Sequence, residues 1–128
     1  MNLKEYFEKT EGTGVLATAD AEGRVDVALY ARPHVIEDNT VAFIMRERLS
    51  HHNLRSNPQA AYLFLEKGPG YKGKRIYLTM LREETNTDLI KQLVRKEHGM
   101  DNPKDDANRY LVFFQIDKER PLIGDHHI

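Results

Sequence analysis

The chain has 128 residues, 40% of them apolar, with no cysteine and a formal net charge of −1. This length fits a single domain, the lack of cysteine excludes disulfides, zinc–thiolate sites and thiol catalysis, and the charge leaves no positive excess to neutralise a nucleic-acid backbone. With no apolar secretory segment and no stretch near the ~20 apolar residues of a membrane span, we expect one cytoplasmic domain over residues 1–128, without nucleic-acid or membrane partners.

The chain opens with a pattern typical of a short amphipathic helix. Asn2 can cap it, and Leu3, Tyr6 and Phe7 share one face. We expect this helix to cover one mouth of a barrel.

Three strands are predicted next, over residues 14–19, 25–32 and 40–46. The first two are joined by a turn that ends in Gly23, and the alternation of the second indicates one buried and one half-exposed face. Pro33 should end or bulge its ladder, since proline cannot donate a backbone hydrogen bond.

The pattern then changes at residues 50–58. This segment is too polar for a strand, begins with Ser50 as a good N-cap and ends at Pro58, so it predicts a two-turn helix. Strands follow over 59–65 and 76–82. The glycine-rich loop between these strands could close over a ligand or could be an ordinary hairpin tip, and the sequence does not separate the two.

The last part of the chain predicts a helix and a strand. The helix begins at Thr87, carries an apolar stripe of leucine, isoleucine and valine, and has Gly99 where a C-cap glycine belongs; it should pack outside the barrel. Residues 101–106 are polar enough for a surface loop, and 110–116 alternate as a strand. The whole is a mainly β (α+β) pattern that predicts a six-stranded antiparallel barrel, closed or partly closed, with short flanking helices.

The turn into the helix at Ser50 is the best candidate for binding chemistry. A helix N-terminus offers free backbone N–H groups and a partial positive charge, which suit a phosphate. Arg46 and Arg48 precede this turn, Ser50 adds a hydroxyl, and Asn53 lies about one turn inside.

Several motifs along the chain resemble the pyridoxamine 5'-phosphate oxidase-like family of FMN-binding split barrels. They are residues 14–19, Gly23, the Asn-Leu-x-x-Asn-Pro element at 53–58, and 68–70 before a strand that contains Arg75. The element at 53–58, entered from one strand and followed by another, is the most specific of them.

The resemblance implies a homodimer with FMN between the protomers, and it implies which residues touch the cofactor. It places residues 28–31 beside the ring system or ribityl chain of FMN. It places Phe43 and Ile44, on the next strand, further along the cofactor, and Arg75 near the flavin ring. The cofactor-binding residues expected in this way, together with those of the phosphate turn, are Ala28, Leu29, Tyr30, Ala31, Phe43, Ile44, Arg46, Arg48, Ser50, Asn53 and Arg75.

Departures from the oxidase pattern bear on the reaction. Oxidases that act on the B6 vitamer carry an Arg-Lys pair where this chain has Leu49 and Ser50, and a substrate lysine where it has Pro33. The tryptophan of their C-terminal region has no counterpart, since the chain contains none. These departures count against oxidation of pyridoxamine phosphate itself, and phosphate binding would rely on Ser50, the helix N-terminus and the two arginines.

The function implied is flavin-dependent redox chemistry on a small molecule, with substrate, electron donor and catalytic residues unknown. Two alternatives stay open, a non-catalytic flavin or electron carrier and a haem-binding relative on the same barrel. Six histidines also invite a metal site, but His51 and His52 are neighbours on a helix and point to different sides. We therefore expect no metal site.

Overall fold

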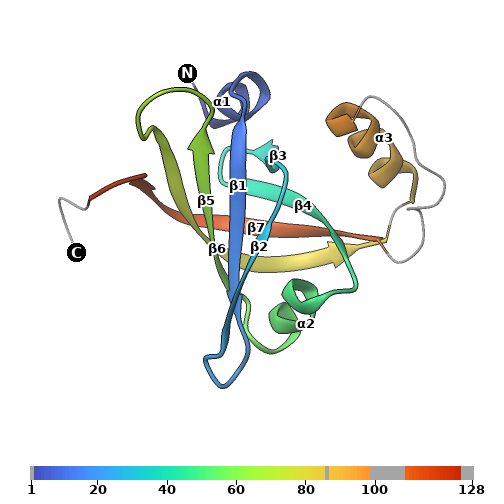
Figure 1. Cartoon of the computed structure of the whole chain (residues 1–128). Coiled ribbons are helices and arrows are strands. Elements are labelled where there is room, and N and C mark those ends of the chain that lie inside the picture. Colours follow the sequence, from blue (N-terminus) through green and yellow to red (C-terminus); the bar gives the residue numbers. More distant parts are fainter. Residues whose placement is uncertain (1, 86, 99–108, 125–128) are drawn as a thin grey trace.

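A computed structural model describes residues 2–85, 87–98 and 109–124. The described elements are α1 (Leu3–Lys9), β1 (Gly12–Ala19), β2 (Val25–Leu29), β3 (His34–Glu37), β4 (Thr40–Arg46), α2 (Leu49–Ser56), β5 (Gln59–Glu66), β6 (Gly73–Glu84), α3 (Thr87–His98) and β7 (Arg109–Pro121). The strands form one antiparallel sheet in the order β2-β1-β5-β6-β7-β4-β3. Figure 1 shows β1 and β5 running across β4 and β7, while β6, which pairs with both β5 and β7, bends from one direction to the other, so that the sheet curls around its own inner face.

The prediction of six strands is wrong, because the described residues contain seven strands in an open sheet. The strand predicted over 25–32 ends at Leu29, and residues 34–37 form a separate strand that pairs with β4. Pro33, which is buried, lies in the segment 30–33 that carries the chain from one edge of the sheet to the other. We call residues 30–33 the crossover segment. Alternation alone could not show where the ladder stops.

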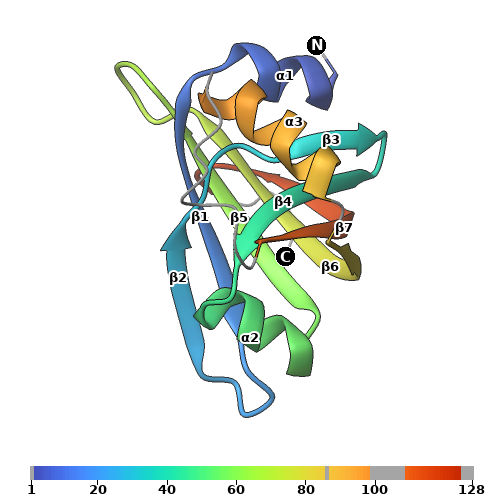
Figure 2. The same cartoon turned by 90° about the vertical axis from the view of Figure 1, so that its right-hand side faces the viewer.

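One main hydrophobic core fills the inside of the curled sheet. Its most buried large side chains include Tyr62, Phe43, Phe64 and Phe114, and Phe7 of α1 packs against them. Asn2 caps α1 as predicted, its side chain accepting a hydrogen bond from the Glu5 N–H at 2.9 Å. The two short helices α1 and α2 lie at opposite ends of the sheet in both views (Figures 1 and 2). The expected cover over one end is confirmed.

The third helix packs on the outside of the sheet, as predicted. Ile90 and Val94 of α3 form a second cluster with Ala42, Leu111 and Phe113 of the sheet, and Figure 2 shows α3 in front of β4 and β7. The predicted C-cap at Gly99 and the loop at 101–106 lie outside the described residues.

A buried tyrosine fixes the crossover segment. The Tyr62 hydroxyl lies 3.2 Å from the carbonyl oxygens of both Tyr30 and Ala31, and Tyr62 is 1% exposed. A Cβ at Gly14 would lie 1.8 Å from this hydroxyl, so β1 needs glycine there for the tyrosine to reach the carbonyls. This contact sets the position of residues 30 and 31, which form one wall of the cavity described next.

Candidate functional site

A cavity of about 480 Å³ lies between β2, the crossover segment and the turn from β4 into α2. This volume is in the range of small-molecule sites. The residues that line it are Asp26, Val27, Ala28, Leu29, Tyr30, Ala31, Ile44, Arg46, Arg48, Leu49 and Ser50. Most of the residues predicted to touch a cofactor therefore lie around one cavity, which we call the β2–α2 pocket.

The β2–α2 pocket contains the start of α2, and the N-cap of this helix lies two residues earlier than predicted. Its first residue is Leu49 and its N-cap is Arg48, so Ser50 is the second helical residue and not the cap. The Ser50 side chain, 3% exposed, is hydrogen-bonded to the Tyr30 hydroxyl instead. Its hydroxyl therefore links the helix start to the crossover segment.

No side chain caps this helix start. Arg48 makes no capping hydrogen bond, and the first turn of α2 holds no acidic residue. The first three N–H groups of a helix, here those of Leu49, Ser50 and His51, have no carbonyl partner within the helix. An arginine at the N-cap is also unfavourable for the helix dipole. Both features lower the stability of the helix start, and both favour a bound anion at this position.

The charges of the pocket residues favour an anion at this end. Arg46 and Arg48 supply two guanidinium groups, and Asp26 is the acidic residue of the lining. Burial raises the pKa of the Tyr30 hydroxyl, and the Ser50 hydrogen bond and the Arg48 charge offset only part of this effect. Tyr30 is thus a neutral hydroxyl near pH 7 and can donate or accept a hydrogen bond.

Two predicted site residues support the pocket from inside the core. Phe43 is 2% exposed and packs its ring against Tyr30, Tyr62 and Phe114 with centroids 5.0 to 6.0 Å apart. Asn53 is 3% exposed, and its amide donates a hydrogen bond to the Thr18 hydroxyl at 3.1 Å, which anchors α2 to β1. Neither side chain lines the β2–α2 pocket.

Arg75 lies apart from the other predicted residues. Its guanidinium donates to the carbonyl oxygens of Pro121 and Gly124, each at 2.8 Å. It lines a separate groove on the outer face of β2, β1, β5 and β6, together with apolar residues such as Val27 and Leu63. Its predicted contact with a flavin ring stays a prediction.

The sequence analysis missed three residues of the pocket, namely Asp26, Val27 and Leu49. Val27 and Leu29 are exposed by 67% and 76%, although an alternating apolar row normally faces a core. Leu49, an apolar residue that follows Arg46 and Arg48 at the start of a helix, was the one signal in the sequence for these missed pocket residues.

Within the described ranges no group of three or more histidine or acidic side chains is arranged to hold a metal ion. None of the described helices combines the length and apolar character needed to cross a bilayer.

Comparison with protein-family models gave no match, and comparison with curated protein sequences gave no significant match. Solved structures do match. An FMN-binding protein from Syntrophomonas wolfei superposes with a TM-score of 0.78 at 15% identity, over 96% of this chain and 85% of its own. An F420 reductase gives 0.75 at 16% identity, over 94% of this chain and 98% of its own.

A protein of Lactobacillus delbrueckii, provisionally named a pyridoxamine 5'-phosphate oxidase, gives a TM-score of 0.66 at 16% identity over 91% of this chain and 88% of its own. The three likenesses extend over nearly the whole length of this chain. The chain has the split-barrel fold of the pyridoxamine 5'-phosphate oxidase-like proteins, and the resemblance seen in its motifs is confirmed at the level of the fold.

Proposed function

We propose that this protein binds FMN in the β2–α2 pocket and uses it to oxidise or reduce a small molecule. The observation that carries the proposal is the uncapped start of α2, which opens into the pocket beside Arg46 and Arg48. A flavin mononucleotide has a dianionic phosphate at one end and a flat, largely apolar ring system at the other. The pocket offers the matching pair of surfaces.

Each wall of the pocket has a definite task in this proposal. The N–H groups of the first turn of α2, the Ser50 hydroxyl and the two arginines bind the phosphate. Leu29 and Ile44 supply apolar surface for the rest of the ligand. FMN supplies hydride or electron transfer when bound, while the protein orients it and excludes water.

The partner implied is a second copy of the chain. Val25, Val27 and Leu29 form an apolar row on β2 that is exposed by 67 to 80%, and β2 is an edge strand. Val27 also borders the apolar groove on the outer face of the sheet, so this surface continues from the β2–α2 pocket onto the neighbouring strands. Monomers rarely leave such a surface in water, and a two-fold dimer buries the same surface on both copies. We propose that the dimer closes the open side of the pocket.

Val27→Asp is expected to convert a dimer into a monomer, because it places a charge in the centre of the proposed interface. Sedimentation velocity of the purified protein measures the change. Leu81→Asp is the matched control, since Leu81 is 49% exposed on β6 outside both pocket and groove. A wild type that stays monomeric at high concentration, or a control that dissociates equally, would contradict the dimer.

The cofactor proposal is tested by the absorbance spectrum of freshly purified protein and by titration of flavin-free protein with FMN and riboflavin. We expect FMN to bind at least about tenfold more tightly than riboflavin, since hydrogen bonds to a charged group contribute about 1.5–3 kcal/mol each. Equal affinities would place the phosphate outside the turn, and a Soret band would favour the haem-binding alternative. Rapid reduction of the bound flavin by NAD(P)H, followed by turnover with an acceptor, would separate an enzyme from a carrier.

A further inference from the structure

A buried histidine lies in the first turn of α2 but is not among the residues of the β2–α2 pocket. His51 is 1% exposed. Its Nδ1 lies 3.1 Å from Oε1 of Glu47, and its Nε2 lies 3.1 Å from Oε2 of Glu83. The ring stacks on Tyr110 with centroids 4.2 Å apart and an interplanar angle of 16°. One side chain therefore joins the start of α2 to β6 and β7.

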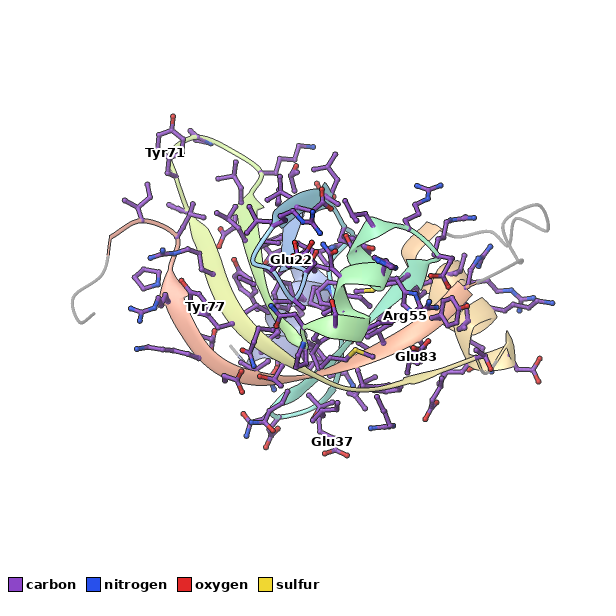
Figure 3. All side chains as sticks on the ribbon, turned by 90° about the horizontal axis from the view of Figure 1, so that it is seen from below. Glu22, Glu37, Arg55, Tyr71, Tyr77 and Glu83 are labelled. Carbon is purple, nitrogen blue, oxygen red and sulfur yellow. The ribbon has the colours of Figure 1, made fainter. Side chains whose placement is uncertain are left out.

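The ionisable groups around His51 form a closed set. Glu47, in the turn before α2, accepts a hydrogen bond from Arg55 at 2.8 Å and is hydrogen-bonded to the Tyr110 hydroxyl. The hydrogen bond with His51 lowers the pKa of Glu47, and the hydrogen bond with Glu47 raises the pKa of Tyr110. Near pH 7 Glu47 is thus a carboxylate and Tyr110 a neutral phenol. Figure 3 shows Arg55 and Glu83 at the same end of the molecule.

When Glu47 and Glu83 are both ionised, the two 3.1 Å contacts are fully satisfied only by a donor on each ring nitrogen. A neutral imidazole has one N–H and one lone pair, whereas an imidazolium has two N–H donors. With a neutral ring, one nitrogen lone pair would face a carboxylate oxygen 3.1 Å away. With an imidazolium, both contacts are charge-assisted hydrogen bonds, and the positive charges of His51 and Arg55 balance the negative charges of Glu47 and Glu83.

We propose that His51 is a positioning residue, held as an imidazolium between Glu47 and Glu83, and that this bridge fixes the phosphate-binding turn of α2. The proposal rests on the proposed function. The backbone N–H of His51 is one of the free N–H groups of that turn, and Ser50, which lines the pocket, precedes it directly. A change in how the His51 ring is held therefore moves the donors that face the phosphate.

The first consequence concerns pH. Loss of the His51 proton at alkaline pH removes one hydrogen bond and a positive charge from this end of α2, so FMN affinity should fall when that proton is lost. The phosphate itself is already dianionic above its second pKa of about 6, so its own titration does not lower the affinity at alkaline pH. Riboflavin shares the ring system, so the ratio of FMN to riboflavin affinity isolates the phosphate site.

The second consequence concerns variants. His51→Gln should lower FMN affinity by about fivefold or more, the lower end of coupling between linked sites. His52→Gln, at the exposed neighbour in the same helix, should have no such effect. Glu83→Gln allows a neutral His51 ring to satisfy both nitrogens, so it should keep FMN bound at pH 7 and remove the alkaline loss of affinity. This variant also keeps the test decisive if His51→Gln does not fold.

The experiment measures FMN and riboflavin affinity of the whole protein and its variants from pH 7 into the alkaline range. In parallel, nitrogen NMR of the flavin-free protein at pH 7 should show both ring nitrogens of His51 protonated. A neutral His51 ring, or an FMN to riboflavin ratio that is flat with pH and unchanged in His51→Gln, would overturn the proposal. If neither flavin binds, the proposed function fails instead, and the NMR signal still decides the state of His51.

Discussion

Replacing Arg48 with Asp is expected to weaken FMN binding more than tenfold and at the same time to stabilise the flavin-free protein. Arg48 is the N-cap of α2, and its backbone is extended, with φ −135° and ψ −176°, which is the conformation that a capping side chain needs. Aspartate there can accept hydrogen bonds from the free N–H groups and also favours the helix dipole.

The two effects of Arg48→Asp have one cause. A carboxylate that caps the helix occupies the donors that would bind the phosphate, and its charge repels the phosphate. The expected gain in the free energy of unfolding is about 0.5–2 kcal/mol, measured by urea denaturation without flavin. The expected loss in affinity exceeds a factor of about ten, because a hydrogen bond to a charged group is lost and a repulsion is added.

Lys67→Asp is the matched control for Arg48→Asp. It makes the same change of charge at a side chain that is 75% exposed and pairs only loosely with Glu11, at 3.5 Å. Lys67 does not line the β2–α2 pocket, so salt should screen its effect on FMN. If Arg48→Asp stabilises the protein and leaves FMN affinity unchanged, the phosphate does not bind at α2.

Local spacing predicted which residues share the turn before α2 better than it predicted the strands of the sheet. Arg46, Arg48 and Ser50 are close in sequence and lie around one turn, so their convergence depends on local structure alone. The separation of β2 from β3 depends on Tyr62, a residue more than thirty positions away, whose hydroxyl contacts the carbonyls of Tyr30 and Ala31. Within residues 25–37, Pro33 is the local signal of a break in the ladder, but it does not show that the strand already ends at Leu29.

Two further placements depended on the curled shape of the sheet. Phe43 and Ile44 are neighbours on one strand and so face opposite sides, but only the curled sheet shows that Ile44 faces the β2–α2 pocket and Phe43 the core. Arg75 was placed by resemblance, and the structure puts it on the outer face with the carbonyls of Pro121 and Gly124. Ser50 was read as a cap because serine favours that position, whereas its partner Tyr30 lies on another element.

The second prediction with a large effect distinguishes the role of Phe43 in the core from that of Ile44 in the pocket. Phe43→Ala should lower the free energy of unfolding by about 3–5 kcal/mol, because it leaves a cavity among Tyr30, Tyr62 and Phe114 that a rigid aromatic core cannot fill. Phe43→Leu keeps most of the volume and should stay folded at a smaller cost. Urea denaturation of the flavin-free proteins measures both.

Ile44→Ala provides the comparison on the same strand. Ile44 is half-buried and lines the pocket, so its truncation should reduce FMN affinity more than Phe43→Leu does, while costing less stability than Phe43→Ala. The physical reason is that a pocket side chain contacts the ligand directly, whereas a core side chain acts on the ligand only by holding Tyr30 in place. A larger loss of FMN affinity in Phe43→Leu than in Ile44→Ala would mean that the ring of Phe43 itself reaches the cofactor, and the cavity between β2 and α2 would then be the wrong site.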